Sequence, residues 1–252
     1  MELKPINDAE LEKHLDSLHP DTIDVFILDH GNYRGAMIHG THFINQMRAN
    51  HEYGPLETLI AGHAYLAAGL LTSNIKGQDR IQLKIRCEGP ARGVSAEATA
   101  NGTVRGYIEQ NPVLEESVNG VFDMSPFIGE GTLSVTKKLQ SAKRPYTGLV
   151  PLEHGNIAQD LTFYFLKSEQ IPTAFNLSIA FDDKGRAVGA GGLFIQAFPS
   201  ASNELSRRLD SRIRTMPSLG KLFSEGLKGE ETLDEHFSDL SAVLIGEKPI
   251  TF

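Results

Sequence analysis

One predicted helix carries small side chains over much of its surface, and this constrains how the chain can pack. Residues 55–73 begin with Pro55, which suits the first turn of a helix, and carry large apolar residues at helical spacing. Alanine and glycine occupy much of the remainder, as in "AGHAYLAAG" (61–69). Side chains this small make the helix thin, so another element can pack closely against it.

Several segments outside this helix alternate between apolar and polar residues, as strands do. The segment "RIQLKIRC" (80–87) places Ile81, Leu83 and Ile85 on one face, which is typical of a half-buried strand. Further segments of this kind are 23–28, 93–100, 103–108, 131–139 and 175–199, the last with a hairpin turn at 183–185. Runs of strands interrupted by a few helices predict an α+β fold with a largely antiparallel sheet packed with helices.

A second predicted helix is rich in aromatic residues and lies in "GNIAQDLTFYFLKSEQIPTAF" (155–175). Apolar residues recur at helical spacing from Ile157, and Pro172 ends the helix at about residue 170 or 171. We expect Tyr164 and Phe165 to pack in the core against the sheet. The residues that follow, 169 and 170, are placed to satisfy backbone groups at the corner between helix and strand.

From residue 200 the chain becomes helix-prone and rich in charges of both signs. Pro217, Gly220, Gly226 and Gly229 interrupt it, so its helices should be short and marginally stable unless they dock on another surface. The apolar residues available for docking are Leu205, Leu209, Ile213, Leu219, Leu222 and Phe223. We therefore expect a helical segment over 200–240 after the α+β core.

Composition excludes several classes of protein. The 252 residues are 40% apolar and 22% charged, and the net charge of −8 argues against a dedicated nucleic-acid binder. A single cysteine, Cys87, permits no internal disulfide and allows a reducing compartment. Residues 1–20 have no signal-peptide pattern, and the longest uncharged run, 60–75, falls short of the roughly 18 residues that span a bilayer. These features predict a cytoplasmic protein with neither nucleic-acid nor membrane partners.

A search for catalytic and metal-binding motifs finds no convincing site. His39 and His42 stand three residues apart, but no cysteine or acidic cluster joins them at ligand spacing, so no metal is expected. The glycine segments 129–135 and 189–196 lead into strands and lack phosphate-loop motifs, and no G-x-S-x-G occurs. Cys87 alternates with the residues of its strand and is expected to be a small inward residue rather than a catalytic thiol. The residues therefore do not predict an enzyme.

Seven segments, taken in order, resemble one known family. They are "YRGAMIHG" (33–40), "GHAYLAAGLL" (62–71), "IRCEGPARGVSAEA" (85–98), "TVRGYI" (103–108), "IGEGTLSVTK" (128–137), "GLVPLEHGNIAQDLTFYFLKSEQIPTAF" (148–175) and "AGGLFIQAFP" (190–199). Their order and spacing are similar to those of the 33 kDa chaperonin family, the redox-regulated heat-shock holdases of the bacterial cytoplasm. The similarity covers about residues 23–200 and is weaker through the helical segment.

The most specific shared motif is Tyr-Phe-x-x-Ser-Glu-Gln-x-Pro, and we expect the motif residues to have structural roles. They are Arg105, Gly106, Tyr107, Gly129, Gly131, Tyr164, Phe165, Ser168, Glu169, Gln170, Pro172, Gly191 and Gly192. The resemblance implies three parts: a chaperone core over 1–199, a helical linker over 200–240, and the start of a truncated redox domain over 241–252.

The resemblance also implies a function. Members of the family are ATP-independent holdases of the stress response, which bind unfolded or oxidatively damaged client proteins, prevent their aggregation and form homodimers when active. The linker of such a protein is metastable and is folded over the core until the redox domain releases it. Our hypothesis is that the apolar residues of 205–223 dock on the sheet in the inactive state and become available to clients on release.

The chain departs from the family at its C-terminal end. The family binds one zinc ion through four cysteines arranged Cys-x-Cys and Cys-x-x-Cys. This chain stops at "EKPITF", about where the first of those cysteines would follow. Cys87 matches none of them, so the zinc ion and the disulfide switch cannot be carried over and no cofactor is expected in this chain. The chain is either a fragment or a homologue without the switch, and its end within a strand-like segment favours the fragment.

Two other functions remain open. A small-molecule enzyme on the same fold would need a polar pocket near His154 or the glycine segments. A scaffold or interaction module would bind one folded partner tightly instead of many unfolded chains.

Overall fold

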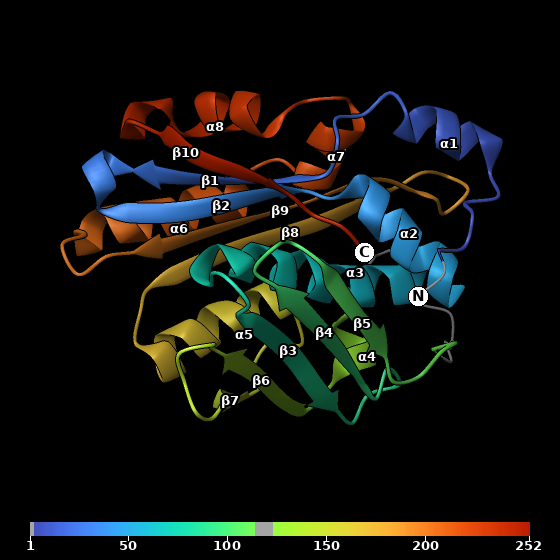
Figure 1. The fold of residues 1–252 in the computed structure, drawn as a ribbon, viewed down its shortest axis with the longest axis horizontal. Coiled ribbons are helices and arrows are strands. Elements are labelled where there is room, and N and C mark those ends of the chain that lie inside the picture. The colour runs from blue at the N-terminus through green and yellow to red at the C-terminus, as the bar shows by residue number, and fades with distance from the viewer. Residues whose placement is uncertain (1–2, 114–122) are drawn as a thin grey trace.

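The computed structural model describes residues 3–113 and 123–252, which form two five-stranded antiparallel sheets with helices around them (Figure 1). Sheet A has the strand order β10-β1-β2-β9-β8, and sheet B has the order β5-β4-β3-β6-β7. The strands of sheet A are β1 (Thr22–Leu28), β2 (Tyr33–His39), β8 (Thr173–Phe181), β9 (Ala187–Ala197) and β10 (Val243–Pro249). Those of sheet B are β3 (Arg80–Cys87), β4 (Gly93–Thr99), β5 (Val104–Ile108), β6 (Gly131–Lys138) and β7 (Tyr146–Pro151). The predicted α+β fold is confirmed, and its antiparallel strands are divided between two sheets.

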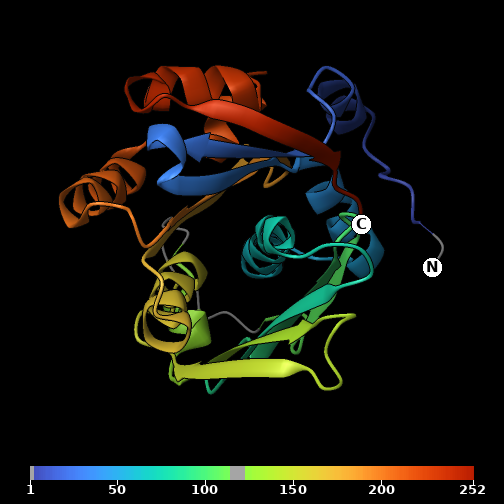
Figure 2. The ribbon, with the colours of Figure 1, turned by 60° about the vertical axis from the view of Figure 1, so that its left-hand side comes forward.

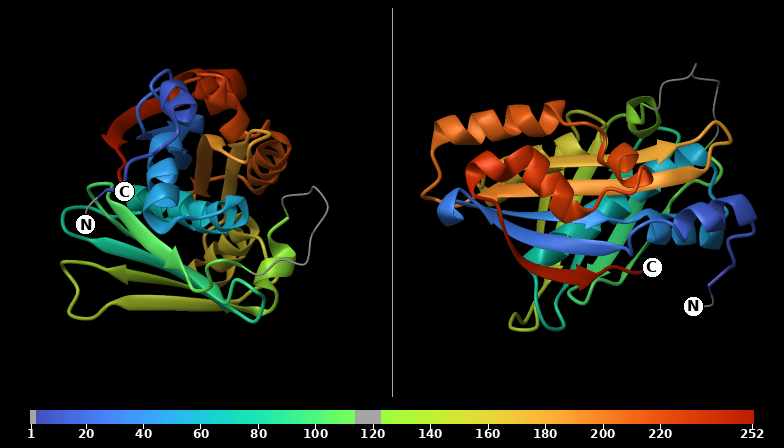
Figure 3. Two further views of the ribbon diagram at one scale, coloured as in Figure 1. Left: turned by 90° about the vertical axis from the view of Figure 1, so that its right-hand side faces the viewer. Right: turned by 90° about the horizontal axis from the view of Figure 1, so that it is seen from above.

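Some helices lie between the two sheets, and others lie on the outer face of sheet A. The helices are α1 (Ala9–Leu15), α2 (Thr41–His51), α3 (Pro55–Leu71), α4 (Ser125–Ile128), α5 (Ile157–Tyr164), α6 (Asn203–Thr215), α7 (Leu219–Ser224) and α8 (Gly229–Phe237). Short turns of other helical types are η1 (Asp29–Gly31), η2 (Thr72–Asn74), η3 (Phe165–Glu169) and η4 (Ser238–Leu240). Helices α3 and α5 lie between the sheets, whereas α6, α7 and α8 lie on the opposite face of sheet A (Figures 1 and 3).

Helix α3 is enclosed between the two sheets (Figure 2). Every residue from Glu57 to Leu71 is buried, and the helix contacts strands of both sheets. Its small residues permit this: a Cβ at Gly62 would overlap the side chain of Ile179, and one at Gly69 would press on that of Ile250. The thin helix predicted from the sequence is therefore the central layer of the molecule.

The last strand of the chain completes sheet A. β10 pairs antiparallel with β1, and Ile250 just beyond it is buried beside α3. Thr251 then forms an isolated bridge with Thr103 near the edge strand of sheet B. Residues 243–252 thus lie against both sheets, while the division of the chain into a core, a linker and the start of a redox domain stays a prediction.

Substitution of Gly69 by valine tests the close packing around α3. A Cβ at Gly69 would lie 2.5 Å from Ile250 Cδ1 and 2.8 Å from Ile38 Cδ1. Because such overpacking costs about 1–3 kcal/mol, we expect Gly69→Val to lower the free energy of unfolding by that amount, measured by urea denaturation. Gly246→Val is the matched control, since no atom lies within 4 Å of a Cβ there. Equal stabilities of the two variants would contradict this packing.

Candidate functional site

The outer face of sheet A and helices α6, α7 and α8 share an apolar cluster, which we call the linker interface. The strands contribute large side chains such as Phe26, Met37 and Leu193. The helices contribute Leu209, Ile213, Leu219, Phe223, Leu233 and Phe237, all of which are buried. Apolar burial is therefore the main force that can hold the helical segment on the sheet.

Helix α6 is held at both ends by polar contacts. At its beginning, the Ser202 side chain accepts a hydrogen bond from Leu205 N–H, and the Tyr33 hydroxyl donates to Ser202 O at 3.1 Å. Near its end, Asn176 on β8 donates to Ile213 O at 2.8 Å. The contacts are few, and each involves a backbone group that water could satisfy instead. Docking of α6 thus depends chiefly on its apolar face.

Helix α7 lies directly on strands β8 and β9 because glycines remove side chains from the contact. A Cβ at Gly189 would overlap Gly220 O, and one at Gly191 would overlap the ring of Phe223. Gly220 N–H donates to Ser178 Oγ at 2.8 Å. The motif residue Gly191 therefore has an identifiable role, which is to leave room for Phe223.

Helix α8 covers a buried carboxylate that sequence reasoning missed. Asp24 on β1 is 7% exposed and lies opposite Glu247 on β10, and the backbone of Gly229 passes close to its carboxylate. Burial, followed by the charge of Glu247, raises the pKa of Asp24 to about 6, with Glu230 acting in the same direction and His19 opposing it. A negative charge on Asp24 therefore weakens the packing of α8 and β10 against β1.

A second buried carboxylate, Asp21, supplies the cap that α2 lacks. Gly40 at the start of α2 has no side chain to cap the helix, and Asp21 accepts hydrogen bonds from the N–H groups of His42 and Phe43 instead. Burial alone would raise the pKa of Asp21, but contacts with His39 and His42 lower it below its usual value. Sequence spacing gives no signal for this cap, because two whole strands, β1 and β2, separate the carboxylate from the helix.

The structure brings the predicted docking residues onto the linker interface. Leu209, Ile213, Leu219 and Phe223 are buried there, and Leu205 and Leu222 are half-buried and pack against the same cluster. The helical segment over 200–240 is thus docked on the sheet in this structure. A role of these six residues in binding clients stays a prediction.

The aromatic motif forms a corner between α5 and β8. Tyr164 and Phe165 are buried in the core between the sheets, as expected. The Tyr164 hydroxyl donates to Glu169 Oε1 at 2.9 Å, and Lys137 Nζ lies 2.7 Å from the same oxygen. Glu169 therefore binds two side chains rather than the backbone groups that sequence analysis assigned to it. Gln170 has left-handed backbone geometry (φ 58°), and its N–H donates to Phe165 O.

The other motif residues also have local surroundings that explain their type. Ser168 lies beside Gly148, and Pro172 accepts a hydrogen bond from Ala197 N–H through its carbonyl. Gly192 leaves room for the side chains of Leu177 and Ile38.

The motif glycines of sheet B lie where backbones approach closely. A Cβ at Gly106 would overlap Ser95 O, one at Gly131 would overlap Arg86 O, and Gly129 has a positive φ of 66°. On the solvent face of this sheet, Arg105 pairs with Glu97 at 2.9 Å, and Tyr107 is 43% exposed. Their roles as structural motif residues stay predictions.

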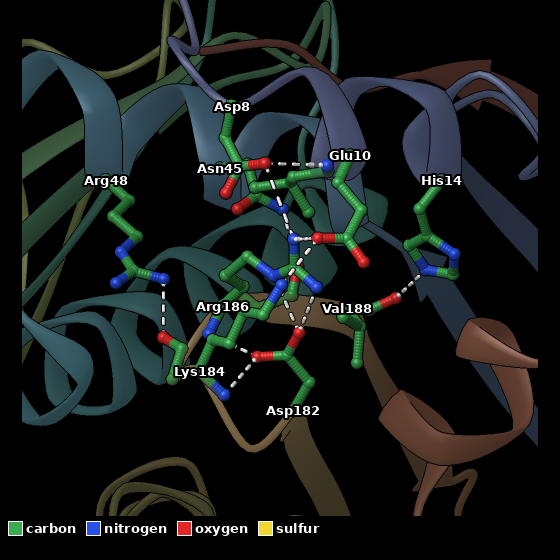
Figure 4. Close-up of polar contacts among 12 residues, drawn as sticks. Asp8, Glu10, His14, Asn45, Arg48, Asp182, Lys184, Arg186 and Val188 are labelled. Carbon is green, nitrogen blue, oxygen red and sulfur yellow. Dashed lines mark hydrogen bonds and ion pairs between the residues drawn. The ribbon is translucent and has the colours of Figure 1, made fainter.

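A polar network that sequence reasoning missed ties α1 and α2 to the hairpin between β8 and β9 (Figure 4). Arg186 lies 2.6 Å from Asp182 and 2.9 Å from Glu10, and Lys184 also lies 2.6 Å from Glu10. On the neighbouring side of the hairpin, the His14 ring lies 2.7 Å from Val188 O. The Lys184–Glu10 pair is exposed, and exposed pairs contribute little individually, so this contact orients α1 more than it stabilises the fold.

Two adjacent pockets lie between α5 and α6. One has a volume of about 380 Å³ and is mainly apolar, and the other has a volume of about 530 Å³ and includes His154 in its wall. The ionisable groups of the larger pocket are His154, Asp210 and Arg214, and the last two are paired at 2.9 Å. This arrangement offers no activated nucleophile or acid–base pair among the described residues.

Neither a metal site nor a membrane span is found in the described part of the chain. Within residues 3–113 and 123–252, no three His, Cys, Asp or Glu side chains are grouped so that they could hold a metal ion. The one cysteine, Cys87, is a free thiol on β3, so the residues present do not fit a four-cysteine zinc site. No helix among the same residues is long and apolar enough to cross a bilayer.

Comparison with known proteins places this architecture in one class. The family model for Hsp33 protein matches residues 21–252. A 33 kDa chaperonin of Lactobacillus delbrueckii subsp. bulgaricus is 34% identical over 82% of this chain and 71% of the relative. One from Aquifex aeolicus is 32% identical over 87% of this chain and 69% of the relative. The crystal structure of the 33 kDa chaperonin (HSP33) from Thermotoga maritima superposes with a TM-score of 0.82 at 31% identity, covering 93% of this chain and 80% of that one.

The two antiparallel sheets and the helices around them are therefore those of a heat-shock chaperonin. The chain belongs to the Hsp33 family, and the resemblance noted in its sequence is confirmed.

The buried carboxylate under α8 predicts how stability depends on pH. Because the folded-state pKa of Asp24, about 6, lies above the usual value near 3.9, its destabilising effect is absent below about pH 4 and is complete above about pH 6. We expect Asp24→Asn to raise the free energy of unfolding at pH 7–8 by on the order of 2 kcal/mol and to match the parent protein at pH 4. Urea denaturation of the parent protein and of Asp24→Asn between pH 4 and pH 8 measures the two free energies of unfolding. Asp234→Asn, on the exposed face of α8, is the control. A constant difference between Asp24→Asn and the parent at all pH values would contradict the assignment.

Proposed function

We propose that this chain is an ATP-independent holdase, which binds unfolded or partly folded client proteins and prevents their aggregation. The linker interface carries this proposal, because it is a large apolar contact between a sheet and a set of short helices. Separation of the two would expose apolar surface on both partners, and such surface is typical of sites that bind other proteins. Membership of a family whose relatives are named chaperonins supports the same function.

The helical layer is suited to reversible docking. α7 has 6 residues and α8 has 9, and helices this short are marginal in water without tertiary contacts. No disulfide can hold them, since Cys87 is the only cysteine of the chain. Loss of about 1.4 kcal/mol of docking free energy changes the ratio of released to docked molecules tenfold. We thus propose a chaperone whose activity depends on how strongly the helical segment docks on sheet A and does not require an oxidant.

Client contact is assigned to the apolar side chains that docking conceals. Leu209, Ile213, Leu219 and Phe223 would become exposed on release, together with Leu193 and its neighbours on the sheet. Leu205 and Leu222, which are half-buried when docked, extend the same apolar face. The clients are unfolded polypeptides, and neither nucleic acid nor a membrane is proposed as a partner, in keeping with the net charge of −8.

The proposal places the protein in the cytoplasm and includes a homodimer as the active form. The outermost strand of sheet A, β10, exposes Val243, Leu244 and Ile245, and exposed strand edges readily pair with another chain. Light scattering coupled to size-exclusion chromatography measures the mass of the active form directly.

The key experiment weakens docking without removing an apolar contact. Gly189→Val inserts a side chain between β9 and α7, where even a Cβ would overlap Gly220 O. Overpacking of about 1–3 kcal/mol would raise the released fraction roughly 5- to 150-fold. We expect the variant to suppress the aggregation of a chemically unfolded client more strongly than the parent protein, measured by light scattering under thiol reductant.

The control is Gly246→Ala, which lies on β10 of the same sheet and meets no atom within 4 Å. Limited proteolysis at Arg207, Arg208, Arg212 and Arg214 of α6 reports release independently of activity. Faster cleavage of Gly189→Val without any gain in suppression would show that the exposed surfaces do not bind clients. The scaffold function would then be favoured, and tight binding to one folded protein would support it.

A further inference from the structure

One edge of sheet A lies at the bottom of a groove, where Thr173, Phe175 and Leu177 are 7%, 8% and 9% exposed. β8 is the outermost strand on that side, and among the described residues no strand pairs with its free edge. Helix α7 covers the far part of β8, where Gly220 N–H donates to Ser178 Oγ. Residues 173–177 remain, and they line the two pockets between α5 and α6.

The backbone groups along this stretch follow from the ladder that β8 makes with β9. Ala197 N–H donates to Pro172 O at 2.9 Å, so this pair is a hydrogen-bonded pair of the antiparallel ladder. Since hydrogen-bonded and non-hydrogen-bonded pairs alternate, the N–H and C=O groups of Thr173, Phe175 and Leu177 point away from β9. They form a row of free donors and acceptors at the edge, which is what an added strand requires.

The two pockets lie next to each other along this edge, and the walls of both include α6 on one side and α5 with the turn after it on the other. The smaller, apolar pocket includes Ala174, Ile195 and Leu209, which belong to the linker interface. The larger pocket includes Phe175 and Leu177, which belong to the core between the sheets, and Ile213 of the linker interface. Because side chains of a strand point alternately to the two faces, a strand added here would send its side chains alternately toward α5 and toward α6.

The residues around the two pockets, which form the rim of the groove, indicate which side chains the added strand carries. Leu166, on the turn after α5, lines both pockets and is 54% exposed, so it can contact an apolar side chain. Arg207 and Arg214 of α6 stand on the rim with Asp210, which Arg214 neutralises at 2.9 Å. The guanidinium of Arg207 therefore leaves the rim with a net positive charge, which favours an acidic side chain on the ligand. The groove is also continuous with the linker interface, where apolar side chains already dock.

We propose that the β8 edge binds one extended segment of an unfolded client, which adds to sheet A as a further antiparallel or parallel strand while the linker remains docked. The segment alternates apolar and polar residues and carries an acidic residue beside the apolar ones. Main-chain hydrogen bonds to residues 173, 175 and 177 supply affinity that is independent of sequence, and the α5 and α6 walls of the two pockets supply the preference for alternation. This inference deepens the proposed holdase function and rests on it.

Short fluorescent peptides test strand addition directly. The probe alternates leucine with serine and glutamate, and its binding to the full chain is measured by fluorescence anisotropy. Two further peptides carry N-methyl groups on every second amide. One peptide is methylated at the odd-numbered residues and the other at the even-numbered residues. Only one of these two peptides loses the N–H groups that face β8. We therefore expect that peptide to bind at least about tenfold more weakly and the other to bind with the affinity of the unmethylated probe. Equal affinities of the two would overturn strand addition.

Variants on the rim locate the site. We expect Leu166→Glu to weaken binding of the probe by roughly tenfold, whereas Leu149→Glu, which alters a residue 63% exposed on β7, leaves it unchanged. Arg207→Glu should reverse the preference between the glutamate probe and a lysine version, whereas Arg208→Glu on the same helix should not. Equal effects of each variant and its control would place the peptide elsewhere.

These outcomes are distinct from failure of the proposed function. If the parent protein suppresses client aggregation but Leu166→Glu binds the probe normally, the β8 edge is not the site and the holdase function stands. If the chain neither suppresses aggregation nor binds the probe, both proposals fail.

Discussion

The packing of α3 between two sheets is the contact on which the rest of the structure depends. Strands of sheet A lie on one side of this helix and strands of sheet B on the other, so the helix joins two sheets that share no continuous ladder. Its glycines let Ile250, at the end of the chain, reach the same core as Ile38 on β2. With one face of sheet A committed to this core, its other face is left for a second apolar contact, and the helices after residue 200 make that contact.

The two faces of sheet A therefore differ in what holds them. The inner face is fixed by a continuous core that includes Tyr164, Phe165 and Phe194, all fully buried. The outer face depends on three separate short helices, each with two large buried anchors, and on glycines that let α7 approach β9. Removal of the outer layer would leave the inner core in place, which gives the molecule a part that can open without general unfolding.

Sequence reasoning predicted the elements well where periodicity was strong and the determinants were local. The thin helix, the half-buried strand at 80–87 and the turn at 183–185 all depend on nearby residues, and the structure has each of them. The division of the strands into two sheets depends on long-range pairing, which no local pattern encodes. For the same reason Asp24 on β1 and Asp21 just before it were missed, because such a carboxylate becomes unusual only when the partners around it are known. Glu169 was assigned to the backbone because one of its two partners, Lys137, lies on β6, far away along the chain.

The order of elements along the chain has a consequence for the helical layer. α6, α7 and α8 lie in sequence between β9 and β10, and both of these strands are built into sheet A. A layer that leaves the sheet while both strands stay paired is anchored at its two ends and forms a closed loop rather than a free tail. The ends of such a loop are constrained, so it gains less conformational entropy on leaving than a tail of equal length would. Its apolar residues also stay close to the strands they uncovered, which keeps both halves of the exposed surface within reach of the same unfolded chain.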